Sequence, residues 1–526
     1  MSAYDRLPTD IDGLDLLLDG GLRFPRGGSV FMVILGGPGS GKTHVALEIA
    51  TRTLARIEGN GGSHVYYSLD QSPAELHAKL REDFGFFQIP GEWGRIVGSL
   101  ENPDHSALVQ SFRPARAASD EHYLVLASLR EQPKDLVTRS SALFERLDAD
   151  LSALTHAAAP VGTRLKPRLV AIDNISVSSL DDGRTVRSAL HQIRDHLAAR
   201  NLHGVFVIET PGGSGDQATF TAAEYAADVI VQLGYHAFGD QFKERSIEIT
   251  KARHQFYYRG THHFSIVGRN EGRLRGARGQ RPPGIHVYPS VPTLLSHLAY
   301  RDDGGVPAPT TSVPFGLADL SIPAGSVSGL VGLPRRVTTA HWLALRFLLA
   351  EAGDGLLVSF RESEADLRAL ARRWFPAAES ERLHVLSFAP EYLSTGKFLK
   401  DVHDGVEALR AQGRHVRRAA LWGLGHLRWA FPLLYDARML LPWMAAFFRQ
   451  ERITSLFVEA AKPANAGATA TADVVAGGET AVATTVDHLL EIAERPDGGC
   501  DLALVRSLSA RTTSRGGRIA IPTPPE

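Results

Sequence analysis

Residues 36–43, GGPGSGKT, combine residue types whose spacing points to phosphate chemistry. They fit the pattern G-x-x-x-x-G-K-[ST], in which glycines let the backbone turn several N–H groups toward one phosphate chain. In this pattern the Lys42 ammonium reaches the β- and γ-phosphates, and the Thr43 hydroxyl is a ligand of Mg²⁺. We predict a Mg-ATP site formed by Gly37, Pro38, Gly39, Ser40, Gly41, Lys42, Thr43 and His44.

The segments on both sides of this loop are those needed to position it. The apolar run SVFMVIL at 29–35 predicts a buried strand, and Leu47, Ala50, Leu54 and Ile57 recur at helical spacing after it. A helix that begins near Lys42 would direct the positive end of its dipole at the phosphates. The loop is therefore expected between a strand and a helix N-terminus.

Two further apolar runs end in polar residues that can serve the same site. HVYYSLDQSP at 64–73 predicts a strand followed by Asp70 and Gln71, and RLVAIDNIS at 168–176 predicts a strand that carries Asp173. Open α/β sheets bind ligands at the carboxyl ends of their strands. We therefore expect Thr43, Asp70 and Asp173 to hold the metal, with Asp173 as the Walker B aspartate.

Length and composition limit the class of protein. A chain of 526 residues is too long for one core, and a net charge of −1 gives no general attraction to nucleic acid or anionic membranes. One cysteine excludes an intramolecular disulfide, no apolar run approaches 18 residues, and the charged N-terminus does not resemble a signal peptide. A cytoplasmic protein without membrane spans is expected.

The second half of the chain repeats stretches of the first half in the same order. PFGLADL (314–320) resembles IDGLDLL, DGLLVSFRESEADL (354–367) resembles HVYYSLDQSPAEL, and ITSLFVEAA (453–461) resembles LHGVFVIET. Such a repeat predicts that one supersecondary unit occurs twice. We expect an active domain at 1–285, a linker at 286–310 and a second domain at 311–526, each α/β with a mostly parallel central sheet and helices on both faces.

The residues with phosphate chemistry are not repeated. Val337 stands where the last loop glycine should be, Thr338 where the lysine should be, and Gly423 at the expected aspartate position. Asp70-Gln71 are matched by Arg361-Glu362, and Lys251-Ala-Arg253 by Arg506-Ser-Leu508. Without lysine and aspartate the second domain is expected to be a pseudo-ATPase, although Arg335, Arg336 and Arg361 leave anion binding open.

With these motifs the chain resembles the KaiC-like branch of the RecA superfamily, strongly in the first half and weakly in the second. The resemblance rests on GLDLLLDGGL (13–22), GGPGSGKT, SLDQSP (68–73), the strand that carries Asp173, and ITKARHQFYYRGTHHFSI (249–266). It implies two tandem RecA-like P-loop NTPase domains in a homohexameric double ring, with ATP between neighbouring subunits. Lys251 and Arg253 would then act as fingers on the neighbour's nucleotide.

One departure from the family bears on the rate of hydrolysis. KaiC-like proteins usually carry two glutamates where this chain has Asp70-Gln71. Asp70 is one methylene shorter, and Gln71 can orient a water but cannot take its proton. The resemblance thus implies a slow ATPase.

Three functions follow from these observations. The first is a slow ATPase switch that regulates a protein partner. The second is an ATP-stabilised scaffold with negligible turnover. The third is a nucleic-acid motor of the RecA or ring-helicase type, disfavoured because the candidate central loops, 211–222 and 461–480, contain only one lysine and no arginine.

Overall fold

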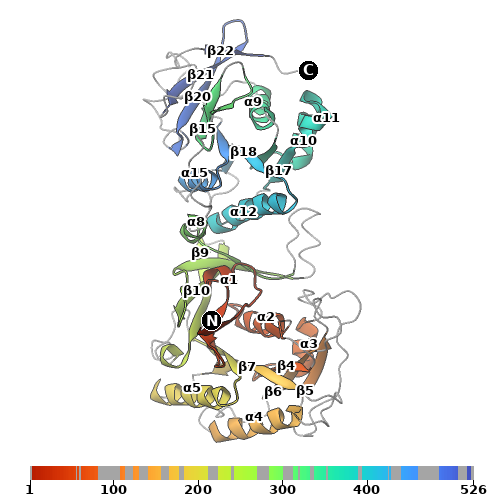
Figure 1. The fold of residues 1–526 in the computed structure, drawn as a ribbon, viewed down its shortest axis with the longest axis vertical. Helices are drawn as coiled ribbons and strands as arrows, with labels where there is room; N and C mark the ends of the chain where they lie inside the picture. Colours follow the sequence, from red (N-terminus) through yellow and green to blue (C-terminus); the bar gives the residue numbers. More distant parts are fainter. Residues whose placement is uncertain are drawn as a thin grey trace. The chain divides into compact units, whose positions relative to one another are not determined.

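The computed structural model divides into two compact units, residues Met1–Pro289 (unit 1) and Ser290–Glu526 (unit 2), and each is considered by itself (Figure 1). The structure describes residues 3–54, 56–57, 61–80, 107–112, 122–129, 140–155, 165–176, 183–210, 223–238, 242–268, 283–299, 312–317, 320–331, 337–350, 353–388, 394–424, 426–427, 440–459, 482, 485–507 and 518–522.

Unit 1 is built on a ten-stranded sheet with a parallel centre and antiparallel edges. Its strands lie in the order β12 (Gly284–Tyr288), β11 (Thr261–Val267), β10 (Phe242–Ala252), β9 (Val229–Phe238), β3 (Phe31–Gly36), β8 (His203–Glu209), β7 (Lys166–Ser176), β4 (Gly62–Ser68), β6 (His122–Ser128) and β5 (Ala107–Phe112). Within the series β9, β3, β8, β7, β4 and β6, adjacent strands run parallel to one another. The unit is therefore a mixed α/β fold with a mostly parallel centre.

Both faces of this sheet are covered by helices. Met32 and Ile34 belong to a core cluster with the apolar residues of α1 (Leu14–Leu17), α2 (Lys42–Leu54) and α3 (Pro73–Ala78). Phe31, Val33 and Leu35 belong to a second cluster with α4 (Ser140–Thr155) and α5 (Gly183–Ala198). Since successive strand residues point to opposite faces, β3 is buried on both sides, which explains its unbroken apolar sequence.

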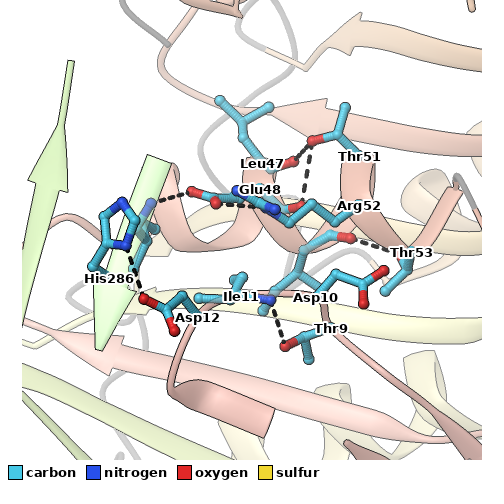
Figure 2. A network of polar contacts seen from close by, with 12 residues as sticks. Thr9, Asp10, Ile11, Asp12, Leu47, Glu48, Thr51, Arg52, Thr53 and His286 are labelled. Carbon is cyan, nitrogen blue, oxygen red and sulfur yellow. Dashed lines mark hydrogen bonds and ion pairs between the residues drawn. The ribbon is translucent and has the colours of Figure 1, made fainter. Parts of the chain in front are cut away.

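A buried carboxylate fixes α2, the helix after the phosphate loop, to the edge strand β12 of the sheet (Figure 2). Glu48 of α2 is fully buried; it accepts from the backbone N–H of Ile285 in β12 at 2.8 Å and from Arg52 Nε at 2.6 Å. Gly284 has φ +131°, and a Cβ there would lie 2.7 Å from Glu48 Oε1. Only glycine therefore allows β12 to approach the carboxylate this closely.

The same network includes the N-terminal segment. His286 of β12 lies 3.0 Å from Asp12 through its Nδ1, and the backbone N–H of Val287 donates to the Asp12 carbonyl (Figure 2). A small two-stranded sheet of β1 (Tyr4–Leu7) and β2 (Leu22–Pro25) flanks this segment in sequence. These contacts join α2, β12 and the start of the chain into one rigid support.

Unit 2 contains an eight-stranded sheet and a small pair, β13 (Ser312–Pro314) with β14 (Ser321–Pro323). The large sheet has the order β17 (Leu383–Ser387), β16 (Asp354–Ser359), β18 (Val416–Trp422), β19 (Thr454–Glu459), β15 (Val327–Val331), β20 (His488–Glu494), β21 (Cys500–Ser507) and β22 (Arg518–Ile521). Read from β22 to β17, strand order and directions are the same as from β11 to β6 in unit 1.

The helices of unit 2 also lie on two faces of its sheet. Leu456 of β19 belongs to a core cluster with α9 (Val337–Leu349) and α10 (Glu364–Trp374), whereas its neighbour Phe457 contacts Phe448 of α15 (Leu440–Gln450). The remaining helices are α8 (Val291–Ala299), α11 (Ala377–Ser380) and α12 (Thr395–Ala411). None of the helices in the described parts of either unit is long and apolar enough to span a membrane.

The junction differs from the linker expected at 286–310. Strand β12 continues to Tyr288 within the first unit, and the second unit begins at Ser290, next to helix α8. Gln450 Nε2 of α15 donates to the Leu295 carbonyl of α8 at 3.4 Å. The strand and the helix are short apolar segments, and the proline- and glycine-rich stretches on either side of them concealed both. Residues 300–311 lie outside the described part.

Candidate functional site

The loop 36–43 joins β3 to α2 as its sequence predicts. Gly39 and Gly41 have φ values of +73° and +101°, a conformation that residues with a Cβ rarely adopt. A Cβ on Gly36 would lie 2.7 Å from the Leu233 carbonyl oxygen, and one on Gly41 would lie 2.9 Å from Ile266 Cδ1. The loop thus keeps a backbone shape that can present N–H groups to an anion at the start of α2.

Lys42 is the cation of this loop. Its side chain is only 7% exposed; Nζ donates to the Gly37 carbonyl at 2.8 Å and lies 3.9 Å from Glu209 Oε2. Burial lowers the pKa of Lys42, while Glu209, Asp173 and Asp70 act in the opposite direction. The positive charge of Lys42 therefore interacts with three carboxylates, and it lies where it could also bind the phosphates of a nucleotide.

Thr43 and Asp173 are brought together from segments 130 residues apart. Thr43 Oγ1 donates to Asp173 Oδ1 at 3.3 Å, and Asp173 is 2% exposed. Burial raises the pKa of Asp173, and the Thr43 hydrogen bond partly offsets that effect. A hydroxyl and a carboxylate are the hard oxygen ligands that Mg²⁺ prefers, so this donor pair fits the ion.

A serine turn places Asp70 and Gln71 at the same end of the sheet. Ser68, the last residue of β4, pairs with Asp173 of β7 across the sheet. Its Oγ accepts from the backbone N–H groups of Asp70 at 3.3 Å and Gln71 at 3.1 Å. The Asp70 residue is exposed, whereas Gln71 is half-buried. Lys42, Thr43, Asp70, Gln71 and Asp173 therefore gather at one site.

Comparison with known families gives one match. Residues 117–272 match the family model whose description is ATPase: KaiC. Unit 1 therefore contains a segment that is similar to the KaiC ATPase family. The segment includes Asp173, Lys251 and Arg253 but begins after the phosphate loop, so the role of that loop rests on its own sequence and geometry. No curated protein matches the chain.

The match supports nucleotide binding of the KaiC type, which fits the gathered residues. It also covers β9 and β10, where Lys251 and Arg253 lie. Ala252 pairs with Val229, and Val229 pairs with Met32, near the amino end of β3. Lys251 and Arg253 therefore lie near the end of the sheet that is opposite to the phosphate loop of the same chain.

Local contacts hold both finger candidates in place. Lys251 Nζ donates to the Glu224 carbonyl, and Arg253 Nη2 donates to the Tyr225 carbonyl at 3.3 Å. Arg253 Nη1 also lies 3.6 Å from Asp228 Oδ1. Burial, followed by the charge of Arg253, lowers the pKa of Lys251. Both cationic side chains are thus bound to the segment 224–228, near the amino end of β3.

His44 lies in the first turn of α2, directly after the phosphate loop. Burial, and then the charges of Lys79 and Arg245, lower the pKa of its imidazole to about 4. The ring is therefore neutral at physiological pH. Of the predicted loop residues, Lys42 is thus the one with a charged side chain.

Three residues near the site were not predicted. Glu209 ends the apolar run GVFVIE, so the criterion applied to Asp173 would have found it. Tyr235 donates its hydroxyl hydrogen to the Gly39 carbonyl and has 47% of its surface exposed. Lys79 Nζ donates to Gln71 Oε1 at 3.2 Å. Tyr235 and Lys79 gave no sequence signal, because only the fold brings them to the loop.

In unit 2 the equivalent strand ends carry different chemistry. Ser359 ends β16 and its Oγ accepts from the backbone N–H groups of Arg361 at 3.3 Å and Glu362 at 3.0 Å, as Ser68 does in unit 1. Ser359 pairs with Trp422 of β18. The pairing therefore assigns Trp422, and not the expected Gly423, to the position of Asp173; the apolar flanks alone allowed a shift of one residue.

Trp422, Glu362 and His341 form a closed cluster in this part of unit 2. Trp422 Nε1 donates to Glu362 Oε2 at 2.6 Å, and the Trp422 and His341 ring centroids are 4.0 Å apart. His341 Nε2 lies 3.4 Å from Glu362 Oε1. Burial acts to raise the pKa of Glu362, but His341 and Trp422 outweigh it and the pKa lies below its ordinary value. Arg335, Arg336 and Leu508 lie outside the described residues.

Proposed function

We propose that this chain is a slow Mg-ATP hydrolase whose active site is in unit 1. The observation that carries the proposal is the convergence of Lys42, Thr43 and Asp173 at one end of the parallel sheet. Bound Mg²⁺ would supply positive charge that offsets the charge of the phosphates. Thr43 and Asp173 would hold the ion, and Lys42 would bind the phosphates.

Hydrolysis is slow in this proposal because of the residues that face the attacking water. Asp70 and Gln71 are placed by Ser68 to orient that water. An amide accepts a hydrogen bond but does not take a proton at neutral pH, so Gln71 cannot serve as a general base. The hydrolytic step therefore depends on positioning and on positive charge.

We further propose that the nucleotide lies between subunits of a ring, expected to have six members. The positions of Lys251 and Arg253 support this arrangement. Both lie near Met32 of β3, and Met32 is four residues before Gly36, where the phosphate loop begins. Along a strand, four residues separate Met32 from the loop by roughly 13 Å. A lysine or arginine side chain does not bridge that distance to its own loop. Each pair would therefore act on the nucleotide of a neighbouring subunit, where added positive charge stabilises the transition state.

Unit 2 is proposed to be a RecA-like pseudo-ATPase that keeps the strand order and lacks the phosphate chemistry. Turnover in unit 1 would then alter the surface offered to a regulated protein partner. The main alternative is an ATP-stabilised scaffold without meaningful turnover, favoured by the same Gln71. A nucleic-acid motor is the third reading; its candidate loops, 211–222 and 461–480, lie outside the described residues.

Light scattering combined with phosphate release tests the proposal. The full chain is measured with ATP, with ADP and without nucleotide, and we expect assembly with ATP that loosens as phosphate appears. Lys42→Ala should reduce hydrolysis at least about 100-fold and weaken assembly, since it removes the buried cation. Thr338→Ala, the matched change in unit 2, should leave both unchanged.

Two results would contradict parts of this proposal. Hydrolysis and assembly that survive Lys42→Ala would exclude the site in unit 1. A nucleotide-dependent assembly that releases no phosphate above the Lys42→Ala level would exclude the enzyme and leave the scaffold.

A further inference from the structure

We propose that Lys79 is a positioning residue that holds the Gln71 amide in an orientation unfavourable for hydrolysis. The inference rests on the proposed function and adds a residue that restrains it. Lys79 lies directly after α3, and its Nζ donates to Gln71 Oε1 at 3.2 Å. Both residues are half-buried, so solvent only partly weakens this contact.

Both ends of the Lys79–Gln71 contact are held by other interactions. The backbone N–H of Gln71 donates to Ser68 Oγ at 3.1 Å. Ser72 then caps α3 in a capping box with Glu75, whose Oε2 accepts from the Ser72 backbone N–H at 2.7 Å. Leu76, on the same short helix, is fully buried. Gln71 and Lys79 are therefore presented to one another by a rigid turn.

The donor identity of lysine fixes how the amide is turned. An ammonium group has three donors and no acceptor, so the oxygen of Gln71, not its nitrogen, faces Lys79. To orient an attacking water as an acceptor, Gln71 must offer that same oxygen to a water O–H. An oxygen committed to an ammonium is a poorer acceptor, and the amide offers its N–H groups to the rest of the site.

Lys79 also lies on the side of the sheet where the metal ligands are. Its charge acts on Asp173, whose carboxylate is 3.3 Å from the Thr43 hydroxyl, and on the His44 imidazole. Restraint of Gln71 by this lysine therefore takes place beside the proposed metal and phosphate positions.

The contact is specific to unit 1 and is not required by the fold. Glu362 occupies the position of Gln71 in unit 2, and the residue eight places later is Leu370, which packs against the core cluster of that unit. The same turn thus forms without a lysine. A purely structural role for Lys79 would not explain why its ammonium is directed at the water-orienting amide.

Steady-state phosphate release by Lys79→Met tests the inference. The variant should raise kcat about three- to tenfold, the factor expected for a partly exposed charge-assisted hydrogen bond, with KM for Mg-ATP unchanged. Lys79→Arg keeps a donor and should retain the slow rate. In a Gln71→Met background, Lys79→Met should have no effect on kcat, because the amide it restrains is gone.

Three outcomes would overturn the inference. A fall in kcat or a rise in KM for Lys79→Met would show that the ammonium contacts the phosphates directly. An equal rise in kcat in the Gln71→Met background would show that Lys79 does not act through Gln71. ATP affinity measured by calorimetry verifies that each variant retains its site, so a folding defect is not read as a rate effect.

The same measurements separate this inference from the proposed function. If phosphate release by the wild-type chain does not exceed that of Lys42→Ala, but release by Lys79→Met does, then Lys79 restrains hydrolysis and explains why the wild-type chain is inactive. If neither exceeds Lys42→Ala although both bind ATP, the hydrolase and the restraint both fail. If the wild-type chain is active and Lys79→Met equals it, only the restraint fails.

Discussion

The two units build the same strand ends and equip them differently. In unit 1, Ser68 pairs with the buried Asp173, which accepts a hydrogen bond from Thr43, and Thr43 follows the buried Lys42. In unit 2, Ser359 pairs with Trp422, whose indole donates to Glu362. One site is a set of charges suited to an external anion and cation, and in the other an indole N–H donates to a carboxylate of the same unit. The strand frame is therefore separable from the chemistry it carries.

The correspondence extends to details that do not bear on phosphate. Asp228 Oδ2 accepts from the Phe31 backbone N–H and lies near Arg194, and Asp487 repeats both contacts with Val327 and Arg449. Both sheets also have a register shift on the second strand of the antiparallel pair, before Lys251 in one unit and before Arg506 in the other. Residues that hold the sheet together are thus kept where residues of the site are replaced.

The largest effect that distinguishes the units should come from the finger positions. We expect Arg253→Ala to reduce phosphate release about 10³- to 10⁵-fold, because it removes charge that stabilises the transition state. Arg506→Ala, at the position in unit 2 that matches Lys251, should leave the rate unchanged. Mixing Arg253→Ala with Lys42→Ala chains should restore part of the activity, since one supplies the nucleotide site and the other the finger. No recovery from mixed assemblies would contradict action between subunits.

A smaller effect should separate the units by stability. Trp422→Ala should destabilise unit 2 by about 3–5 kcal/mol, because it leaves a cavity and removes the donor to Glu362. Hydrogen exchange at β16 and β18 measures the loss, and ATP binding by unit 1 should not change. Trp422→Phe keeps an aromatic ring but loses the indole N–H, and it should cost about 1–2 kcal/mol. Equal exchange rates in both variants and the wild type would show that the cluster contributes little.

The smallest effect concerns pH. Burial raises the pKa of Asp173, so as the pH falls a proton competes with Mg²⁺ at a higher pH than it would for an ordinary carboxyl group. Affinity for Mg-ATP should therefore weaken on acidification, by at most about tenfold per pH unit since one proton is exchanged. Calorimetry with magnesium over a pH series measures it. Asp173→Asn should bind Mg-ATP weakly, and its affinity should no longer fall as the pH is lowered. If the affinity of that variant depends on pH as steeply as that of the wild type, another group is responsible for the effect.

The secondary structure around motifs whose residues are adjacent in the chain was predicted correctly. The loop 36–43 needs only a strand, a glycine-rich turn and a helix start, all encoded locally in SVFMVILGGPGSGKT. Asp173 was found because an apolar run ends in it, and β4 and β7 do bring Ser68 and Asp173 into register. The same criterion, applied one strand further, would have included Glu209.

Register and side-chain contacts were beyond the sequence. Trp422 rather than Gly423 takes the aspartate position because hydrogen-bonded pairing with β16 decides the register, which apolar flanks specify only to within a residue. Lys79 reaches Gln71 because a capped turn folds back on itself. The order of amino acids thus specifies which residue types are available for phosphate chemistry. Tertiary structure alone decided which of them meet, since contacts between distant segments depend on strand order and helix direction.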